Sequence, residues 1–172
     1  MSETTASTTP GVRVERVEWD DPRAVALREA MEFEMGARYA GRDADSTPDK
    51  EEALHRALAV DPAGVFATIL VVDESTGTPL GHAALRDLRG EWEMKRVIVA
   101  VAARGRGIGA LLMSELDRAA REGGAARIIL QTGDRQPEAV RLYERSGYTP
   151  IPVYPPYIDT IPFSLCYEKV LA

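Results

Sequence analysis

The sequence predicts an α/β fold: a single domain in which a mixed, mostly antiparallel central sheet is flanked by helices on both faces. Three observations lead to this prediction. The 172 residues suit one domain with a substantial core. The run VRVERV alternates apolar and polar residues, and VFATILVV is β-branched and bounded by turn residues, as strands are, whereas other segments repeat apolar residues at helical spacing. The order of these segments predicts an antiparallel meander followed by a strand–helix–strand crossover.

The N-terminal half is expected to form a strand, two helices and a hairpin. The alternation in VRVERV predicts a strand over 12–17, and Asp21 before Pro22 predicts a capped helix start. A second helix is expected near 51–60. The runs VFATILVV and LGHAALRDL are separated by turn residues, and they predict a β-hairpin.

The C-terminal half is expected to contain the crossover and a closing strand. Its predicted elements are, in order, a strand in EMKRVIVAV, a helix from Ile108 to Gly123–Gly124, a strand in RIILQT, a helix in PEAVRLYERS, an extended YTPIPVYPPY and a strand in IPFSLCYEKVL. No internal repeat or linker divides these elements, so one domain over 12–172 is predicted.

Composition narrows the class of protein. The Ser/Thr-rich residues 1–11 predict a disordered lead-in without the basic and apolar regions of a secretory signal. The net charge of −6 argues against general nucleic-acid binding, and no stretch approaches the roughly 20 apolar residues of a membrane helix. The single cysteine, Cys166, excludes an internal disulfide. These features favour a cytoplasmic protein.

A glycine-rich stretch, ARGRGIGALL, leads directly into an apolar helical pattern. The first turn of a helix leaves backbone N–H groups without partners, and the helix dipole adds partial positive charge there. Glycines let a backbone approach a ligand closely, while Arg104 and Arg106 add donors suited to phosphate oxygens. The stretch therefore predicts a phosphorylated ligand, most simply a pyrophosphate.

Three other structures could also use these glycines. A phosphate-loop NTPase needs a lysine and a hydroxyl that Ile108, Gly109 and Ala110 do not supply. A dinucleotide-binding fold matches G-x-G-x-x-A at Gly105, Gly107 and Ala110, but that motif usually opens the first βα unit. A tight strand-to-helix turn would explain the glycines and leave the interleaved arginines unexplained.

Two motifs resemble one known family. The segment EMKRVIVAVAARGRGIGALLM resembles the R/Q-x-x-G-x-G/A motif of the GNAT superfamily of N-acetyltransferases, at Arg104, Gly107 and Gly109. RIILQTGDRQPEAVRLYERSGY and SLCYEKVL are similar to later segments of that family. The resemblance covers about residues 12–170 and is strongest from 91 onward. It implies direct transfer of acetyl from acetyl-CoA to a primary amine of a small molecule or peptide, and it leaves a homodimer open.

The resemblance also implies which residues bind acetyl-CoA. These are Ile98, Val99, Val101, Arg104, Gly105, Arg106, Gly107, Ile108, Gly109, Ala110 and Gln136. The backbone N–H of Val99 is expected to polarise the thioester carbonyl. Val101 and Ala103 depart from the proline and the aromatic residue that are common at these places, but neither departure removes a backbone donor.

Two residues correspond to catalytic positions of the family. Glu93 occupies the place of a general base, which often acts through water, and Tyr143 matches a tyrosine that serves as general acid. Each has a structural alternative: Glu93 as a solvated strand carboxylate beside Lys95 and Arg96, and Tyr143 as a core residue. Glu91, on the same strand face, is the substitute candidate for the base.

The remaining candidates are expected to be structural. His82 lies in mid-strand without a residue at metal-ligand spacing, and His55 is expected on a helix surface. Cys166 is expected to pack in the last strand and not to act as a nucleophile. No metal site is predicted.

The acceptor site is expected between EFEMGARYAGRDADSTPDK and PVYPPYIDT, as the resemblance implies. Its acidic candidates for attracting an ammonium group are Glu32, Glu34, Asp43 and Asp45. Tyr154 and Tyr157 could stack on a cation, although a solvated acidic face and packing tyrosines are the alternatives. A non-catalytic acyl-CoA sensor is the second function class, which needs neither Glu93 nor Tyr143.

Overall fold

A computed structural model describes residues 4–5, 9–42 and 44–172. The strands are β1 (Thr4–Thr5), β2 (Val12–Val17), β3 (Val65–Asp73), β4 (Pro79–Leu88), β5 (Glu91–Val99), β6 (Arg127–Thr132), β7 (Thr149–Ile151) and β8 (Leu165–Val170). The helices are α1 (Pro22–Arg38), α2 (Pro48–Leu58), α3 (Ile108–Glu122), α4 (Pro137–Arg145) and α5 (Tyr157–Thr160), with short 3-10 turns η1 (Pro62–Gly64) and η2 (Val101–Ala103).

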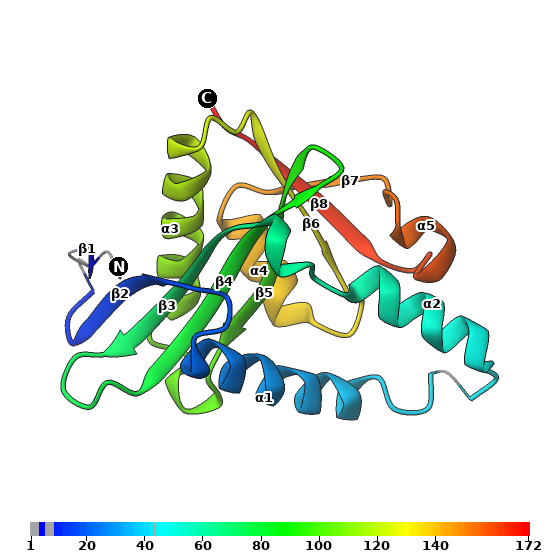
Figure 1. The fold of residues 1–172 in the computed structure, drawn as a ribbon, viewed down its shortest axis with the longest axis horizontal. Coiled ribbons are helices and arrows are strands. Elements are labelled where there is room, and N and C mark those ends of the chain that lie inside the picture. Colours follow the sequence, from blue (N-terminus) through cyan, green and yellow to red (C-terminus); the bar gives the residue numbers. More distant parts are fainter. Residues whose placement is uncertain (1–3, 6–8, 43) are drawn as a thin grey trace.

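The described strands form one sheet in the order β1-β2-β3-β4-β5-β6-β8-β7 (Figure 1). All neighbouring pairs are antiparallel except β5 and β6, which are parallel and are joined through α3. Parallel neighbours need such a crossover connection. The mixed, mostly antiparallel sheet predicted from the sequence is confirmed.

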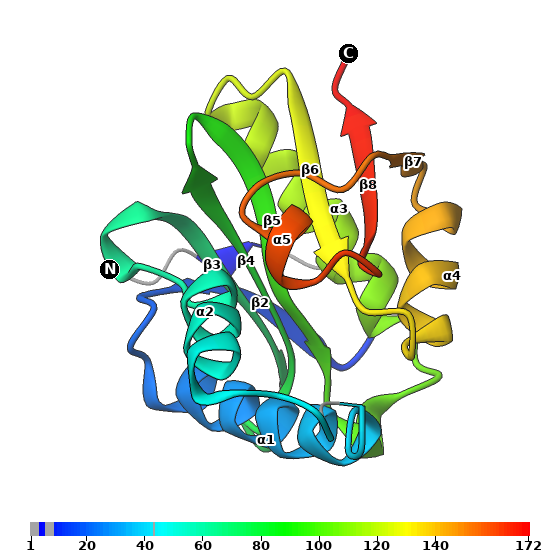
Figure 2. The same cartoon turned by 90° about the vertical axis from the view of Figure 1, so that its right-hand side faces the viewer.

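Helices cover both faces of the sheet, as alternation along the strands requires. In β3, Ile69 and Val71 face α3 and α4, whereas Leu70 and Val72 face α1. A third cluster forms where α2 packs against α5, around the fully buried Tyr157 (Figure 2). The predicted arrangement of helices on both faces is thereby confirmed.

The boundaries follow local signals where such signals exist. Asp21 caps α1 by accepting a hydrogen bond from the Arg23 N–H at 2.9 Å, as predicted. Helix α3 ends before Gly123, also as predicted. Helix α5 was not predicted, because a single turn inside a proline-rich segment has no periodic pattern to reveal it.

Three boundaries differ from the expectations or cannot be compared with them. Strand β5 spans 91–99 instead of 93–101, and β8 is shorter than the segment expected to form it. Of the expected lead-in, Thr4–Thr5 pairs with β2, while residues 1–3 and 6–8 lie outside the described ones. Within the described ranges, no helix combines the length and apolar character needed to cross a membrane.

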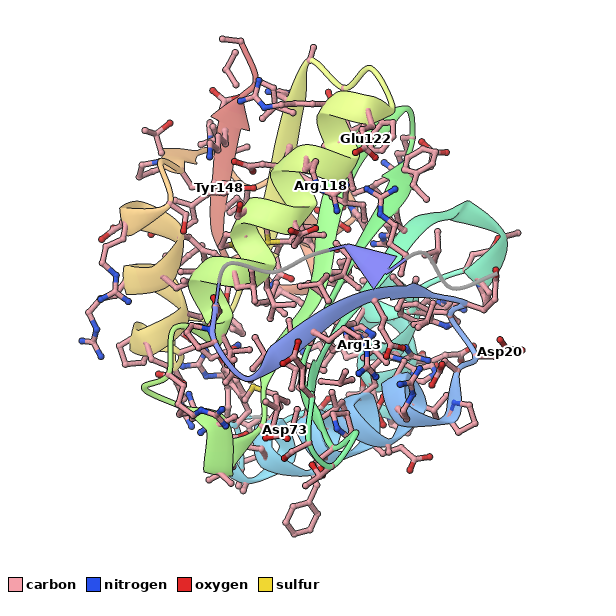
Figure 3. The ribbon with its side chains drawn as sticks, turned by 90° about the vertical axis from the view of Figure 1, so that its left-hand side faces the viewer. Arg13, Asp20, Asp73, Arg118, Glu122 and Tyr148 are labelled. Atoms are coloured by element: carbon pink, nitrogen blue, oxygen red, sulfur yellow. The ribbon has the colours of Figure 1, made fainter. Side chains whose placement is uncertain are left out.

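An exposed ion pair joins β2 to α3, on the face of the molecule that Figure 3 shows. Arg16 lies 2.7 Å from the carboxylate of Glu122, which also accepts a hydrogen bond from Arg118 at 2.9 Å. Exposed pairs of this kind contribute little to stability. The attachment of α3 therefore depends on the apolar face formed by Ile108, Leu112 and Leu116.

Helix α3 packs closely against the sheet at Gly81 of β4. A Cβ at this position would lie 2.7 Å from Ile108 Cγ2 and 3.1 Å from Leu112 Cδ1. We expect Gly81→Ala to lower the free energy of unfolding by about 1–3 kcal/mol, because a packed core yields only with strain. Urea denaturation measures the change.

The matched control for this substitution is Gly36→Ala in α1, where a Cβ would meet no described atom within 4 Å. Alanine there should raise the free energy of unfolding by about 0.5–1 kcal/mol through helix propensity. If Gly81→Ala were as well tolerated as Gly36→Ala, the close packing of α3 on β4 would be contradicted.

Candidate active site

The centre of the sheet opens between β5 and β6. Their pairing runs from Trp92 and Ile128 to Met94 and Leu130 and then stops, although β5 continues to Val99 and β6 continues beyond Leu130. Two residues of β5, 96 and 97, lie opposite the single residue 83 of β4, which is a β-bulge. The separation leaves a V-shaped gap whose closed end is at Met94.

His82 of β4 contacts the bulge directly. Its Nδ1 lies 2.7 Å from the carbonyl oxygen of Arg96, which has a positive φ of 56°, and its Nε2 lies 3.0 Å from Nη1 of Arg28. Because a carbonyl oxygen only accepts and a guanidinium only donates, Nδ1 carries the proton and Nε2 accepts. Burial lowers the pKa of His82 to about 4, assisted by the charges of Arg28 and Arg96. His82 is therefore neutral and structural.

The end of β5 presents backbone groups to the gap. The Ala100 N–H donates to the carbonyl oxygen of Leu80 in β4 at 2.8 Å, and Val99 is paired with Gly81. Since N–H and C=O groups alternate sides along an antiparallel strand, those of Val99 face away from β4. The Val99 N–H is thus directed to the side where β6 has separated.

The glycine turn forms the start of α3 at the mouth of the gap. Gly105 and Gly107 have φ values of 83° and 79°, and a Cβ on either would meet no described atom within 4 Å. Gly107 is the N-cap of α3, and no side chain in the described part of the chain caps it. Gly109 has another role, because a Cβ there would lie 3.0 Å from Leu142 of α4.

The side chains around this turn differ in their availability. Arg104 is exposed but paired: its Nη2 lies 2.8 Å from Oε2 of Glu34, and its Nε donates to the Val99 carbonyl oxygen at 3.2 Å. The bond from Arg104 lowers the pKa of Glu34. Arg106 is exposed on the same turn. Helix α1 therefore reaches the glycine turn through Glu34, a contact that no local sequence pattern predicts.

The other predicted donor-site residues occupy three environments. Ile98 and Ile108 are buried, the first beside α1 and the second on the side of α3 that packs against the sheet. Val101 is 72% exposed in η2, and Ala110 is exposed on the first turn of α3. Gln136 begins α4, with its Nε2 3.4 Å from the hydroxyl of Tyr39.

Glu93 lies next to the closed end of the gap and is 0% exposed. Its Oε1 accepts from Nε of Arg86 at 2.8 Å, and its Oε2 accepts from the hydroxyl of Tyr154 at 2.7 Å. The hydroxyl of Tyr157 lies 3.0 and 3.3 Å from the two oxygens. The alternative that Glu93 is a solvated strand carboxylate is wrong.

Lys95 extends this buried cluster along β5. Its Nζ donates to the Tyr157 hydroxyl at 3.0 Å, and burial lowers its pKa to about 8, opposed by the charge of Glu93. Arg86 also donates to the Tyr157 hydroxyl, at 3.2 Å. Tyr154 and Tyr157 therefore do more than pack or stack: both hydroxyl groups bind the carboxylate.

Glu91, the substitute base, lies elsewhere. It accepts from Arg127 at 2.7 and 3.1 Å, at the end of β5 that is remote from the gap. The bond from Arg127 lowers the pKa of Glu91. These two hydrogen bonds from Arg127 engage both carboxylate oxygens and hold Glu91 away from the gap, whereas Glu93 lies at its closed end.

Tyr143 is a buried residue of α4 on the opposite face of the sheet from Glu93. Its ring lies edge-on to that of Tyr148, with centroids 6.2 Å apart, and 6.4 Å from that of Tyr167. Burial raises its pKa, so the hydroxyl keeps its proton at neutral pH. The structure does not bring Glu93 and Tyr143 together: the plane of the sheet lies between them, and the gap opens in that plane.

Comparison with known proteins agrees with this geometry. The model of the acetyltransferase (GNAT) family matches residues 24–148. The chain belongs to the GNAT acetyltransferase family. It is 34% identical over 103 residues to the IAA acetyltransferase of Azospirillum brasilense, covering 59% of this chain and 67% of that protein. It is also 34% identical over 70 residues to the uncharacterised N-acetyltransferase YjcF of Bacillus subtilis, covering 41% and 48%.

Solved structures share the fold of this GNAT acetyltransferase. A protein of Klebsiella pneumoniae classed with the acyl-CoA N-acyltransferases has a TM-score of 0.73 at 25% identity, over 94% of this chain and 98% of the other. The yncA protein of Salmonella typhimurium, solved with acetyl-CoA, has a TM-score of 0.59 at 17% identity, over 94% and 95%. Family membership makes the protein an acyl-CoA-dependent N-acetyltransferase, with acetyl-CoA as the usual donor.

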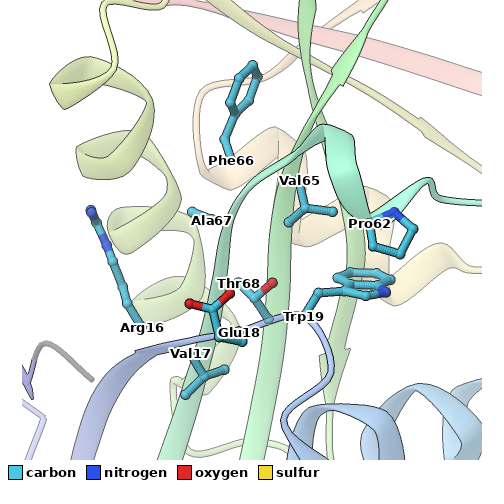
Figure 4. A pocket seen from close by; sticks show the side chains of 9 residues that line it. All are labelled: Arg16, Val17, Glu18, Trp19, Pro62, Val65, Phe66, Ala67 and Thr68. Atoms are coloured by element: carbon cyan, nitrogen blue, oxygen red, sulfur yellow. The ribbon is translucent and has the colours of Figure 1, made fainter. Parts of the chain in front are cut away.

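Two cavities of this GNAT acetyltransferase lie away from the glycine turn. One of about 220 Å³ is formed by the ends of β2 and β3, where Trp19, Pro62 and Phe66 surround it (Figure 4). The other, of about 360 Å³, lies between α2, α5 and the preceding loop, and Leu54, Asp45 and Asp159 contribute to its walls. Leu54 also packs in the cluster that contains Tyr154 and Tyr157, so this second cavity adjoins the Glu93 side of the sheet.

The other sequence expectations near the site have mixed outcomes. Cys166 is buried, and burial raises its pKa, which agrees with a packed thiol. His55 is exposed on α2, as expected, and Asp43 lies outside the described residues. Across the ranges the structure describes, no group of three or more His, Cys, Asp or Glu side chains could hold a metal ion.

The neutral state of His82 makes stability depend on pH. Its pKa is about 4 in the fold, against an ordinary 6.5, so the unfolded chain binds its proton more readily. The contribution is complete above pH 6.5 and is lost as pH falls toward 4. We expect the stability difference between wild type and His82→Asn to be about 2 kcal/mol smaller at pH 5 than at pH 7.5.

Urea denaturation of both proteins at the two pH values checks this expectation. His55→Asn removes a histidine from the exposed surface of α2 and serves as the matched control. An equal pH dependence in wild type and His82→Asn would contradict a neutral, buried imidazole.

Proposed function

We propose that this protein transfers the acetyl group of acetyl-CoA directly to a primary amine of a small molecule or peptide. The observation that carries the proposal is the gap between β5 and β6, which opens beside the uncapped N-terminus of α3. A long, thin thioester arm fits between two separating strands, while the phosphates of its carrier fit the start of a helix.

The fit of acetyl-CoA rests on the chemistry of the turn. The free N–H groups at residues 107–110 and the guanidinium groups of Arg104 and Arg106 suit a pyrophosphate, with Gly105 leaving the approach open. The backbone of Val99 suits the amide groups of the arm, and Ile98 and Val101 flank it on either side. Gln136, across the gap on α4, offers an amide.

Three groups of this chain would serve the chemical step. The Val99 N–H donates a hydrogen bond to the oxygen on which charge develops. Tyr143 gives its proton to the departing sulfur, and because a tyrosine hydroxyl is protonated at neutral pH, it can do so without a lowered pKa. Glu93 receives the proton of the entering ammonium group; deprotonating an amine of pKa about 10.4 at pH 7.4 costs about 4 kcal/mol.

The proton count of the proposed reaction balances. The amine loses one proton to Glu93 and a second to solvent as the new amide forms, while Tyr143 gives one proton to the departing sulfur and regains one from solvent. Glu93 then returns its proton to solvent. The net products are the acetylated amine, free CoA and one proton.

Arg104→Gln tests the binding of acetyl-CoA. Loss of a charged hydrogen bond to phosphate should raise the Kd by about 10- to 100-fold, measured by isothermal titration calorimetry. Arg121→Gln, an exposed arginine at the far end of α3, is the matched control and should bind as wild type does. An unchanged Kd in Arg104→Gln would remove Arg104 from the phosphate site.

Tyr143→Phe tests the reaction. We expect kcat to fall by about 10²- to 10⁴-fold, with acetyl-CoA binding retained, because the leaving sulfur loses its proton donor. Thiol release from acetyl-CoA is measured with polyamines, aminoglycosides, amino acids and peptides with free N-termini. The amine that turns over identifies the acceptor class.

Tyr148→Phe is the matched control for Tyr143→Phe. The Tyr148 hydroxyl is buried and makes no hydrogen bond to the described residues, so its removal should leave kcat unchanged. Acetyl-CoA binding without transfer to any amine would contradict the proposed function.

A further inference from the structure

The carboxylate of Glu93 has no open path to an amine in this structure. A carboxylate offers about four lone-pair sites, and Glu93 accepts hydrogen bonds from Arg86, Tyr154 and Tyr157 on its two oxygens. Its side chain is also fully buried. A proton must therefore reach Glu93 through one of the side chains already bonded to it.

The three partners of Glu93 differ in their access to the surface. Arg86 is buried and also donates to the Ala59 carbonyl oxygen at 2.8 Å; a guanidinium does not release its proton in proteins. Tyr157 is fully buried, and its oxygen already accepts from Arg86 and Lys95. Tyr154 is partly exposed, and its contact with Glu93 is the shortest of the set, at 2.7 Å.

We propose that Tyr154 is a further catalytic residue, which takes the proton of the acceptor ammonium group while it passes its own hydroxyl proton to Glu93. This role rests on the proposed amine acetyltransferase function. One N–H bond of the ammonium breaks, and its proton bonds to Oη of Tyr154. The original O–H bond of Tyr154 breaks, and that proton bonds to Oε2 of Glu93. The nitrogen keeps the electron pair with which it attacks the thioester carbon.

The surroundings favour a coupled transfer through a neutral tyrosine. Burial and the charge of Glu93 raise the pKa of Tyr154, so a free tyrosinate is not populated. The other groups facing this pair are Arg86 from β4, Lys95 from β5, Tyr157 from α5 and Cys166 from β8. The cations and the Tyr157 hydroxyl hold the carboxylate in place, and among the described partners of Glu93 only Tyr154 is partly exposed.

Tyr154→Phe separates proton transfer from packing, because it removes the hydroxyl and keeps the ring. Wild type and variant are compared with two acceptors: the amine of highest turnover in the panel, which is an ammonium at pH 7, and methoxyamine, which is neutral there. We expect Tyr154→Phe to lower kcat by about 10²- to 10⁴-fold with the charged amine and by less than tenfold with methoxyamine. The loss with the charged amine should shrink as pH rises toward its pKa.

Two further variants test whether the effect of Tyr154→Phe comes from the loss of proton transfer to Glu93. Tyr148→Phe is the matched control, with full activity expected on both acceptors. Glu93→Gln combined with Tyr154→Phe should be no slower than the slower single variant, since two residues acting in series lose their effect once. The thermal midpoint and the Kd for acetyl-CoA report whether each variant is folded.

The outcomes separate the two proposals. Equal losses of Tyr154→Phe on both acceptors, or full activity on the charged amine, would overturn the role of Tyr154 and leave the enzyme an acetyltransferase. Failure of wild type to acetylate any amine, methoxyamine included, would overturn the proposed function and the role of Tyr154 with it. A folded Tyr154→Phe that is slow only with the charged amine would support the transfer.

Discussion

The separation of β5 from β6 after Met94 and Leu130 is the constraint on which the rest of the site depends. A strand in mid-sheet normally satisfies its backbone on both sides, so a separation leaves N–H and C=O groups in need of partners. The bulge at Arg96 redirects β5, and the imidazole of His82 donates a hydrogen bond to the Arg96 carbonyl group that the bulge frees. Arg104 likewise donates a hydrogen bond to the Val99 carbonyl group. These two hydrogen bonds stabilise the open edge. Neither of them involves the Val99 N–H, so a ligand can bind that group without displacing them.

Helix α1 connects the two sides of this opening. Arg28 holds the imidazole of His82, which in turn holds the bulge, and Glu34 binds Arg104 at the glycine turn. Farther along, Tyr39 accepts a hydrogen bond from the Arg135 N–H at 3.2 Å, beside Gln136. Helix α1 and its C-cap residue therefore contact the bulge, the glycine turn and the start of α4, so the placement of α1 affects each part of the proposed donor site.

The sequence reveals those features that depend on neighbours along the chain. Alternation predicts β2, the turn residues between two apolar runs predict the hairpin of β3 and β4, the Asp21 cap predicts the start of α1, and the glycine turn predicts the N-terminus of α3. Arg86 could also have been found, because the tight turn at Arg89 and Gly90 places it opposite Glu93 in the hairpin. A two-residue turn fixes the register of the hairpin, and that register places Arg86 opposite Glu93.

The rest of the site arises from contacts between distant segments. Tyr154 and Tyr157 reach Glu93 across 61 and 64 residues, and no periodic pattern encodes such an approach. The segment that carries them is proline-rich, which suggested an extended chain and concealed α5. The burial of Glu93 follows from this packing, and a charged strand such as EWEMKRV gives no local sign of it. Long-range packing decides whether a carboxylate is solvated or enclosed.

The proposed proton transfer explains the enclosed charges better than stability does. Removing Glu93, Arg86 and Lys95 from water costs several kcal/mol for each ion, and apolar residues of similar volume are often as stabilising as a buried ion pair. The cluster instead holds the carboxylate of Glu93 in one position, because side chains from β4, from α5 and from the segment before α5 all form hydrogen bonds to it. A group that must accept a proton at one defined point gains from such rigidity, since a low dielectric strengthens each bond to it. The position of this cluster, at the closed end of the gap, is where a reacting amine would need it.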